Sequence, residues 1–425
     1  MGVTEHSYPN GLRLLLDPMP DALSCTVNLC AASGLRYESA AKAGISHFVE
    51  HMLFKGTHTR TARRIAEEAD DRGATLNAYT CKEFTCVYAR SLPEQLGDML
   101  VLLEDMIRNS RMDEKDIATE KGVILEEIAM YEDMPEELAF DLFYDVAWAG
   151  HMLSKNILGS RKTVGNITEN DLRQHMAAFF SPEKTVISIC GAFEPTAAEA
   201  AIAGGFGSAP RGAAQAAVHE PAAFQSGLRF THKTVEQNQM ILAFPGLTGN
   251  DTRRYHAALL STMLGGATSS RLFQRLREEL GVVYSVDFFN VHHRQEGLCG
   301  VALGLNEKNQ VKALREVLRV LRDFPDSVTL QELQRAQAQA TAGLVMSMES
   351  CTARAARAAN NMLLYDEMHP IAESIQRYRA VTLEEMTAFA KDRLRMEEYV
   401  FCVLGKCAKR TEKELRSLLP AYERT

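Results

Sequence analysis

The feature that most constrains the fold is that the chain repeats itself. The apolar segment SCTVNLCAASGLR at 24–36 matches QNQMILAFPGLTG at 237–249 in place and character. Towards the end of each half, TVISICGAF at 185–193 matches EYVFCVLGK at 398–406. Both pairs are separated by roughly 212 residues, and self-similarity at a fixed spacing is typical of a duplicated structural unit. We therefore expect two similar domains.

A stretch rich in Gly, Ala and Pro separates the halves, at residues 204–227. The sequence thus predicts an N-terminal domain at 1–205, a linker at 206–227 and a C-terminal domain at 228–425. Strand patterns mix with long helical patterns such as RRIAEEADDRG without regular alternation, which favours an α+β fold over a doubly wound sheet. We expect each domain to be a mostly antiparallel mixed sheet flanked by helices.

Composition excludes several classes of protein. The net charge of −8 argues against a nucleic-acid partner, which needs a basic surface. No apolar run approaches the roughly 18 residues that span a membrane, and the N-terminus lacks the basic and apolar regions of a signal peptide. Nine cysteines, an odd number, suit reduced thiols better than a disulfide framework. We expect a cytoplasmic protein without a membrane or nucleic-acid partner.

Three polar groups interrupt an apolar stretch at residues 44–57, GISHFVEHMLFKGT. On a helix, His47 and His51 are about 40° apart and Glu50 lies about 60° to the other side, so all three share one face. Two imidazoles at this spacing can hold one zinc ion. A carboxylate beside them stands where a general base would take a proton from metal-bound water.

The duplication sharpens this interpretation. When the second half of the sequence is aligned on the first, Ala258, Ser261 and Thr262 occupy the positions of the polar trio. The helix is therefore repeated, but its three polar groups are not. The alternative is a surface helix with incidental histidines. Burying unpaired polar groups is costly, and the flanking residues are apolar: Phe48, Val49, Met52, Leu53 and Phe54.

A third ligand is expected from TEKGVILEEIAMYED at 119–133. Glu126 and Glu127 are adjacent, so a helix can aim only one of them at the metal. Glu120 and Glu127 are two turns apart on one face, an arrangement typical of a supporting carboxylate behind a metal ligand. The spacing alone leaves Glu126 and Glu127 open.

HFVEHMLFKGT followed by EKGVILEEI resembles the inverted-motif zinc peptidases of the M16 group. That group includes pitrilysin, insulin-degrading enzyme and the mitochondrial processing peptidases, and the chain is most similar to the last and their bacterial relatives. The resemblance implies that His47, His51 and Glu127 bind Zn²⁺. It also implies that Glu120 supports this site and that Glu50 is the catalytic base.

The same resemblance extends to substrate binding. LNAYTCKEFT at 76–85 is similar to the family's edge strand, in which an Asn-Ala pair, here Asn77 and Ala78, receives the backbone of a peptide substrate. Phe54 matches a position that lines the pocket just past the cleavage site; the alternative is a residue of the helix core.

In the second half, residues 264–286 are similar to a family segment that carries an arginine and a tyrosine seven apart, here Arg277 and Tyr284. The resemblance implies that they bind the substrate backbone and stabilise the tetrahedral intermediate. The alternative is that Arg277 forms a salt bridge and that Tyr284 is a residue of the core.

The implied function is a zinc metalloendopeptidase that hydrolyses short or unfolded peptides. The peptide would lie as an added edge strand in a closed chamber, and Glu50 would assist the attack of zinc-bound water. The competing hypothesis is a catalytically silent scaffold subunit, but such subunits typically lose a ligand or the base, which this chain keeps. A hydrolase of non-peptide substrates is opposed by the edge-strand match.

The resemblance also predicts assembly. Larger family members hold four such domains in one chain, whereas this chain has two, which implies a dimer. Because the zinc motif and the Arg/Tyr pair occur in one sequence, we expect a homodimer. A second, non-identical subunit is the alternative, since some bacterial relatives divide the two motifs between different chains.

Overall fold

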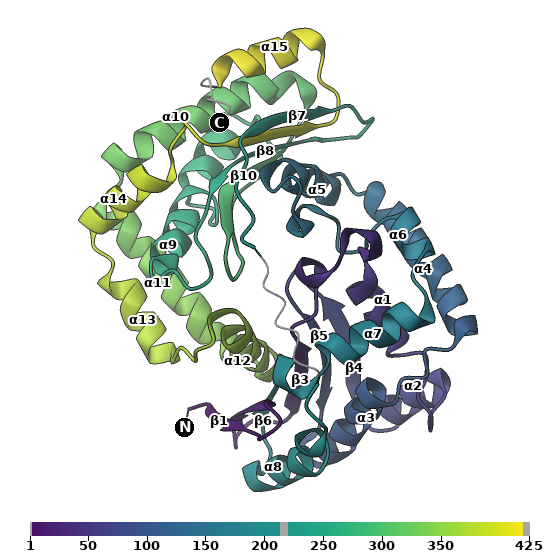
Figure 1. The fold of residues 1–425 in the computed structure, drawn as a ribbon. Coiled ribbons are helices and arrows are strands. Elements are labelled where there is room, and N and C mark those ends of the chain that lie inside the picture. The colour runs from purple at the N-terminus through teal and green to yellow at the C-terminus, as the bar shows by residue number, and fades with distance from the viewer. Residues whose placement is uncertain (1, 213–219, 420–425) are drawn as a thin grey trace. The chain divides into compact units, whose positions relative to one another are not determined.

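A computed structural model describes residues 2–212 and 220–419, which form two compact units (Figure 1). Residues 213–219 of the predicted linker lie outside the described residues. Neither unit is a continuous half of the sequence. The first comprises Met1–Ala129, Lys155–Glu220 and Met346–Met368, and the second comprises Met130–Ser154, Pro221–Val345 and His369–Thr425.

The described residues of the first unit build a six-stranded sheet in the order β1-β2-β6-β3-β5-β4. β2 and β6 are parallel, and all other neighbours are antiparallel. The strands are β1 Thr4–Ser7, β2 Arg13–Pro18, β3 Cys25–Ala31, β4 Thr75–Thr80, β5 Thr85–Ser91 and β6 Thr185–Gly191. The helices are α1 Ile45–Met52, α2 Ala62–Asp70, α3 Leu96–Arg108, α4 Glu114–Glu132, α6 Arg161–Gly165, α7 Glu169–Phe179, α8 Pro195–Gly204 and α12 Cys351–Tyr365.

The described residues of the second unit build a five-stranded sheet in the order β7-β11-β8-β10-β9. Its strands are β7 Gly227–Thr231, β8 Asn238–Pro245, β9 Ser285–His292, β10 Gly297–Leu305 and β11 Val400–Leu404. Its helices are α5 Pro135–Ala147, α9 Arg254–Leu264, α10 Gln310–Ser327, α11 Leu330–Ser347, α13 Ile371–Ala380, α14 Leu383–Arg393 and α15 Lys409–Leu418. The last residues of α4 and of α11 cross from one unit into the other.

The two sheets share one pairing scheme, which confirms the predicted duplication and the α+β fold. β7 and β11 are parallel, as β2 and β6 are, and the remaining neighbours of the second sheet are antiparallel. The segments matched in the sequence become β3 and β8, and β6 and β11, at equivalent places in their sheets. β1 has no counterpart among the described strands of the second sheet.

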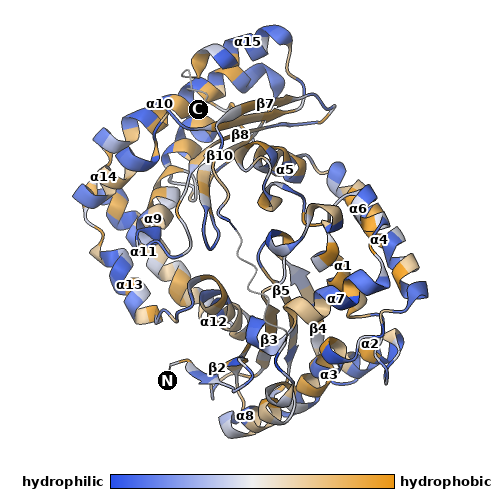
Figure 2. Cartoon of the chain, in the orientation of Figure 1, coloured by the Kyte–Doolittle hydropathy of each residue, from blue (hydrophilic) through white to orange (hydrophobic). Residues whose placement is uncertain are grey.

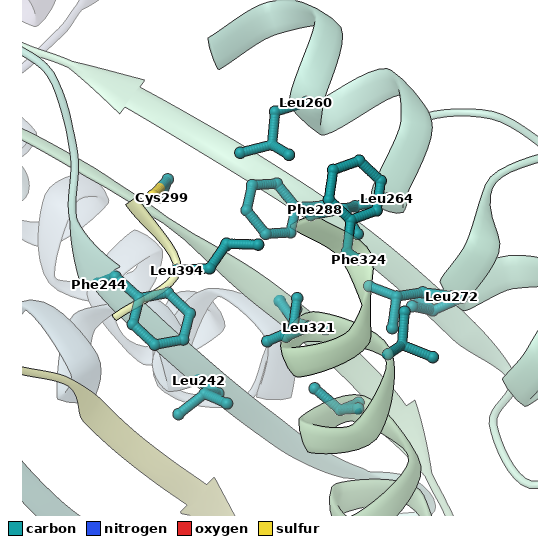
Figure 3. Close-up of a cluster of buried hydrophobic side chains, with 14 of the residues drawn as sticks. Leu242, Phe244, Leu260, Leu264, Leu272, Phe288, Cys299, Leu321, Phe324 and Leu394 are labelled. Carbon is teal, nitrogen blue, oxygen red and sulfur yellow. The ribbon is translucent and has the colours of Figure 1, made fainter. Parts of the chain in front are cut away.

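Each sheet is covered on both faces. In β8, Met240, Leu242 and Phe244 belong to one cluster of buried side chains, and Ile241 and Ala243 to another, because successive side chains of a strand point to opposite faces. Figure 3 shows the first cluster, where Leu242 and Phe244 lie among side chains of the surrounding helices. The colour of hydrophobic residues covers much of β8, whereas helices such as α10 and α13 alternate hydrophobic with hydrophilic residues (Figure 2).

One covering helix of each sheet comes from the other half of the sequence. α5 packs on β8 and β11, although it belongs to the N-terminal half, and α12 packs on β3 and β6, although it belongs to the C-terminal half. A strand that is buried on both faces needs apolar side chains packed against both. In each sheet, the helix from the other half of the sequence supplies part of this packing. Each unit therefore requires both halves of the chain.

The cysteines follow the expectation of reduced thiols, since all nine are free in the structure. Cys81 lies in the turn between β4 and β5, and Cys86 lies in β5. Cys81 consequently packs against the same cluster as Cys86. None of the described helices is both long and apolar enough to cross a membrane.

Phe143→Ala in α5 is expected to lower the free energy of unfolding by about 3–5 kcal/mol, because Phe143 is fully buried against strands of the second unit. Chemical denaturation measures this loss. Amide hydrogen exchange should accelerate in β8 and β11 before β3 and β5. The control Val101→Ala, at a side chain that is 57% exposed, should change stability by about 0.5 kcal/mol or less. Equal effects of the two variants would contradict the prediction.

Candidate metal centre

Helix α1 is fixed at its first turn by a buried carboxylate. The helix starts after Gly44, whose φ of 95° is left-handed; a Cβ there would lie 2.5 Å from the carbonyl oxygen of Leu158. The carboxylate of Glu38 accepts hydrogen bonds from the backbone N–H groups of Gly44 at 2.7 Å and Ser46 at 2.9 Å. These bonds satisfy donors that a helix start leaves without a partner. Glu38 thereby sets where α1 begins.

A histidine of α7 also holds this end of α1. Nε2 of His175 lies 2.8 Å from Oγ of Ser33 and 3.2 Å from Oγ of Ser46. Burial lowers the pKa of His175 to about 3, so its ring is neutral at neutral pH. We read this cluster as structural, because both serines are fully buried.

His47 and His51 project from α1 towards Glu127 of α4. The ring centroids of the two histidines are 4.6 Å apart. Oε2 of Glu127 lies 3.5 Å from Nε2 of His47 and 3.5 Å from Nε2 of His51. One ligand atom from each residue lies within 4.8 Å of the other two, and no other trio of His, Cys, Asp or Glu in the described part of the chain is that compact.

This spacing fits a zinc ion. The distance of 3.5 Å between Glu127 and each imidazole exceeds the roughly 2.7–3.2 Å of a good N–H···O hydrogen bond. Tetrahedral ligands at about 2.0–2.1 Å from zinc lie about 3.3–3.4 Å apart. Two imidazoles and one carboxylate are also a donor set found at catalytic zinc sites. The three residues are therefore placed to hold the ion.

A second carboxylate of α4 orients His51. Nδ1 of His51 lies 3.0 Å from Oε2 of Glu120, and Nζ of Lys55 lies 2.6 Å from Oε1 of the same group. Glu120 is only 3% exposed, so the lysine compensates a buried negative charge. The contact with Glu120 leaves Nε2 of His51 directed at Glu127. Sequence reasoning missed Lys55, although its position four residues after His51 could have suggested it.

The protonation states of these side chains favour the binding of a cation. Burial and the neighbouring His51 lower the pKa of His47 to about 4, so this ring is neutral at neutral pH and offers a lone pair. Burial opposes the charged form of His51, but the carboxylates of Glu127 and Glu120 outweigh it and raise its pKa. The interaction with His51 lowers the pKa of Glu127. Nδ1 of His47 is buried and has no hydrogen-bond partner among the described residues.

Glu50 lies beside this trio on α1. Its Oε2 accepts a hydrogen bond of 2.6 Å from Oγ1 of Thr80, the last residue of β4. Burial raises the pKa of Glu50, and the hydrogen bond from Thr80 partly offsets that shift. Sequence reasoning missed Thr80, because nothing in its spacing links it to residue 50.

β4 is an edge strand, as predicted, because it pairs with β5 alone among the described strands. The predicted segment 76–85 is shorter than expected: the strand ends at Thr80, and the chain then turns into β5. The backbone N–H of Ala78 donates to Oδ1 of Asn77 at 2.8 Å. The backbone amide of Ala78 is thus engaged by a side chain of its own strand.

The remaining predicted residues are Phe54 of the first unit and Arg277 and Tyr284 of the second unit. Arg277 is exposed in a short π-helix, Phe273–Glu279, where its guanidinium lies 5.0 Å from the ring centroid of Phe273. Tyr284 precedes β9 and is 67% exposed, so it is no core residue. Arg277 forms no ion pair with any described residue. Phe54 follows α1 and is half-buried; its role, like those of Arg277 and Tyr284, stays a prediction.

Comparisons with known proteins find zinc proteases among the relatives of this chain. Residues 13–161 match the family model described as "Insulinase (Peptidase family M16)", and residues 166–340 match "Peptidase M16 inactive domain". The chain is 33% identical to "Uncharacterized zinc protease YmxG" of Bacillus subtilis, over 95% of this chain and 98% of that protein. It is 32% identical to "Uncharacterized zinc protease SCO5738" of Streptomyces coelicolor, over 92% and 87%. In fold it is similar to a protease from Helicobacter pylori, with a TM-score of 0.89 at 18% identity over 95% and 99%.

Glu127→Gln should weaken zinc binding by about 100-fold or more, because the amide replaces an anionic ligand. The adjacent Glu126→Gln is the matched control, since Glu126 is exposed and should leave affinity unchanged. Competition with a chelator, read by metal analysis of the desalted protein, gives both affinities. Equal losses in the two variants would mean that Glu127 is not a ligand.

Proposed function

Because the chain belongs to the M16 (insulinase) family of peptidases, we propose that it is a zinc-dependent endopeptidase of short or unfolded peptides. The observation that carries the proposal is the trio His47, His51 and Glu127 with Glu50 beside it. Family membership indicates the class of protein. The grouping of these four side chains supports the proposal that this chain is an active member of the family.

In the proposed centre, different side chains bind the zinc and orient its ligands. His47, His51 and Glu127 would hold the zinc, with Glu120 and Lys55 keeping His51 in orientation. Bound there, zinc supplies a Lewis acid that polarises a carbonyl group and makes water a nucleophile near neutral pH. The protein contributes the preset arrangement of these groups.

Glu50 is the proposed general base. Its carboxylate takes a proton from the attacking water and then delivers it to the amine that leaves. The charged form is required for the first step, and the Thr80 hydroxyl favours it by donating to Oε2. No nucleophilic serine or cysteine enters this route.

The proposed substrate lies along β4. A peptide added to a sheet edge is fixed by main-chain hydrogen bonds, and the N–H of Ala78 would serve once Oδ1 of Asn77 releases it. Asn77 is exposed, so its freed amide could bond the peptide in turn. In the same proposal, Phe54 lines the pocket past the cleavage site. The exposed Arg277 and Tyr284 bind the peptide backbone and stabilise the oxyanion, within a closed chamber.

A silent scaffold subunit is the second candidate. The presence of all three ligands and the base argues against it, because a scaffold has no need to keep four expensive polar groups together. A cytoplasmic location stays a prediction, which the free thiols suit.

Glu50→Gln should abolish cleavage of an unstructured peptide, by about 10²–10⁴-fold, while the protein still binds zinc. A peptide-library digest compares this variant with wild type, with chelator and with zinc added back. Loss of activity on chelation and its return with zinc would support the proposal. A Glu50→Gln variant that cuts at the wild-type rate, or a wild type that cuts nothing when loaded with zinc, would refute it.

We also propose a homodimer, in which the Arg277 and Tyr284 of one subunit serve the zinc site of the other. Sedimentation velocity of the wild type should then report twice the mass of 47.2 kDa. Arg277→Ala and a Glu50→Gln variant, each inactive alone, should regain part of the activity when mixed. A monomer that is fully active would contradict the dimer and leave the zinc chemistry intact.

A further inference from the structure

The Glu50 carboxylate has a single hydrogen-bond partner among the described residues, and this partner comes from the edge strand. Oγ1 of Thr80 donates to Oε2 of Glu50 at 2.6 Å, a short distance typical of a hydroxyl bonded to a charged oxygen. Thr80 lies three residues after Asn77 on β4. One contact therefore links the strand expected to receive the peptide with the base expected to act on it.

The register partner of Thr80 lies beside Ser33, which contacts the same helix as Thr80 does. Oγ1 of Thr85, the register partner of Thr80, lies 3.3 Å from Oγ1 of Thr80 and donates to the carbonyl oxygen of Ser33 at 2.9 Å. The hydroxyl of Ser33 donates to that of Ser46 at 3.4 Å. The Thr80 proton goes to Glu50 and the Thr85 proton to the Ser33 carbonyl oxygen, so the two threonine hydroxyls are in contact without a hydrogen bond between them. Ser46 and Glu50 are one helical turn apart, so Ser33 and Thr80 each donate a hydrogen bond to a side chain of α1.

We propose that Thr80 is a positioning residue that fixes Glu50 in its productive orientation. This inference rests on the proposed function. With Oε2 tied to Thr80, the other carboxylate oxygen is the one that exchanges the proton, and it keeps one direction throughout the reaction. A side chain such as that of glutamate otherwise rotates among several conformers, and misplacement of a base costs rate.

The chemistry of this role separates it from a structural one. Thr80 forms no hydrogen bond with His47, His51 or Glu127 among the described residues, so loss of its hydroxyl should leave zinc content intact. It should also leave peptide binding intact, because the backbone of β4 remains. Only the step that uses Glu50 should slow. A merely structural Thr80 would instead change zinc content, peptide affinity or folding.

The test compares Thr80→Val, which keeps the shape of threonine without its hydroxyl, with Thr80→Ser, which keeps the hydroxyl. Zinc-loaded full-length protein is assayed on an unstructured peptide, with kcat and KM separated. Thr80→Val should lower kcat about tenfold to a hundredfold with KM within about twofold, and Thr80→Ser should recover most of kcat. Thr4→Val is the matched control, because Thr4 is an exposed strand residue at the opposite edge of the same sheet; it should match wild type.

Peptide affinity is measured separately in a Glu50→Gln background, where no cleavage interferes. Adding Thr80→Val to that background should leave the dissociation constant unchanged. A wild-type kcat in Thr80→Val, or a loss that appears in affinity or zinc content instead, overturns the inference alone. If Thr80→Val does not fold, Thr80→Ala and Thr80→Ser carry the same comparison. A zinc-loaded wild type without activity overturns the proposed function, and this inference with it.

Discussion

The convergence of α1 and α4 on one point is the constraint on which the rest of the first unit depends. One ligand atom from each of two imidazoles and a carboxylate lies within 4.8 Å of the other two, although burial disfavours the charged forms of such groups. The surrounding residues hold them there. Glu38 fixes the start of α1, Glu120 and Lys55 fix the ring of His51, and the edge strand fixes Glu50.

The duplicated fold explains how one unit can carry the proposed metal site while the other has no equivalent of the polar trio. Both sheets use the same pairing scheme, and α9 occupies in the second half the place that α1 holds in the first. At the equivalent positions, Ser261 donates to the carbonyl oxygen of Phe288 and Thr262 to that of Ala258. These short side chains satisfy themselves on nearby backbone and leave no ligand group free. The second unit thus lacks the polar trio at these positions, and contact of its exposed Arg277 and Tyr284 with substrate stays a prediction.

Much of this could be predicted from the sequence, for physical reasons. Helical periodicity places His47, Glu50 and His51 on one face, and a two-turn spacing pairs Glu120 with Glu127. The choice of Glu127 over Glu126 needed the family resemblance. Both residues lie on one helix, and the sequence alone does not say which of the two faces the histidines. Contacts between distant elements were beyond reach: Thr80 meets Glu50 only after β4 and α1 have packed. The exchange of α5 and α12 was equally invisible, since an apolar helix face does not say which sheet it covers.

The most direct measurement of the central claim is anomalous diffraction at the zinc edge, from crystals of the zinc-loaded protein. The account predicts one strong peak at about 2.0–2.1 Å from Nε2 of His47, from Nε2 of His51 and from a carboxylate oxygen of Glu127. A peak elsewhere, or none between α1 and α4 at full zinc loading, would contradict it.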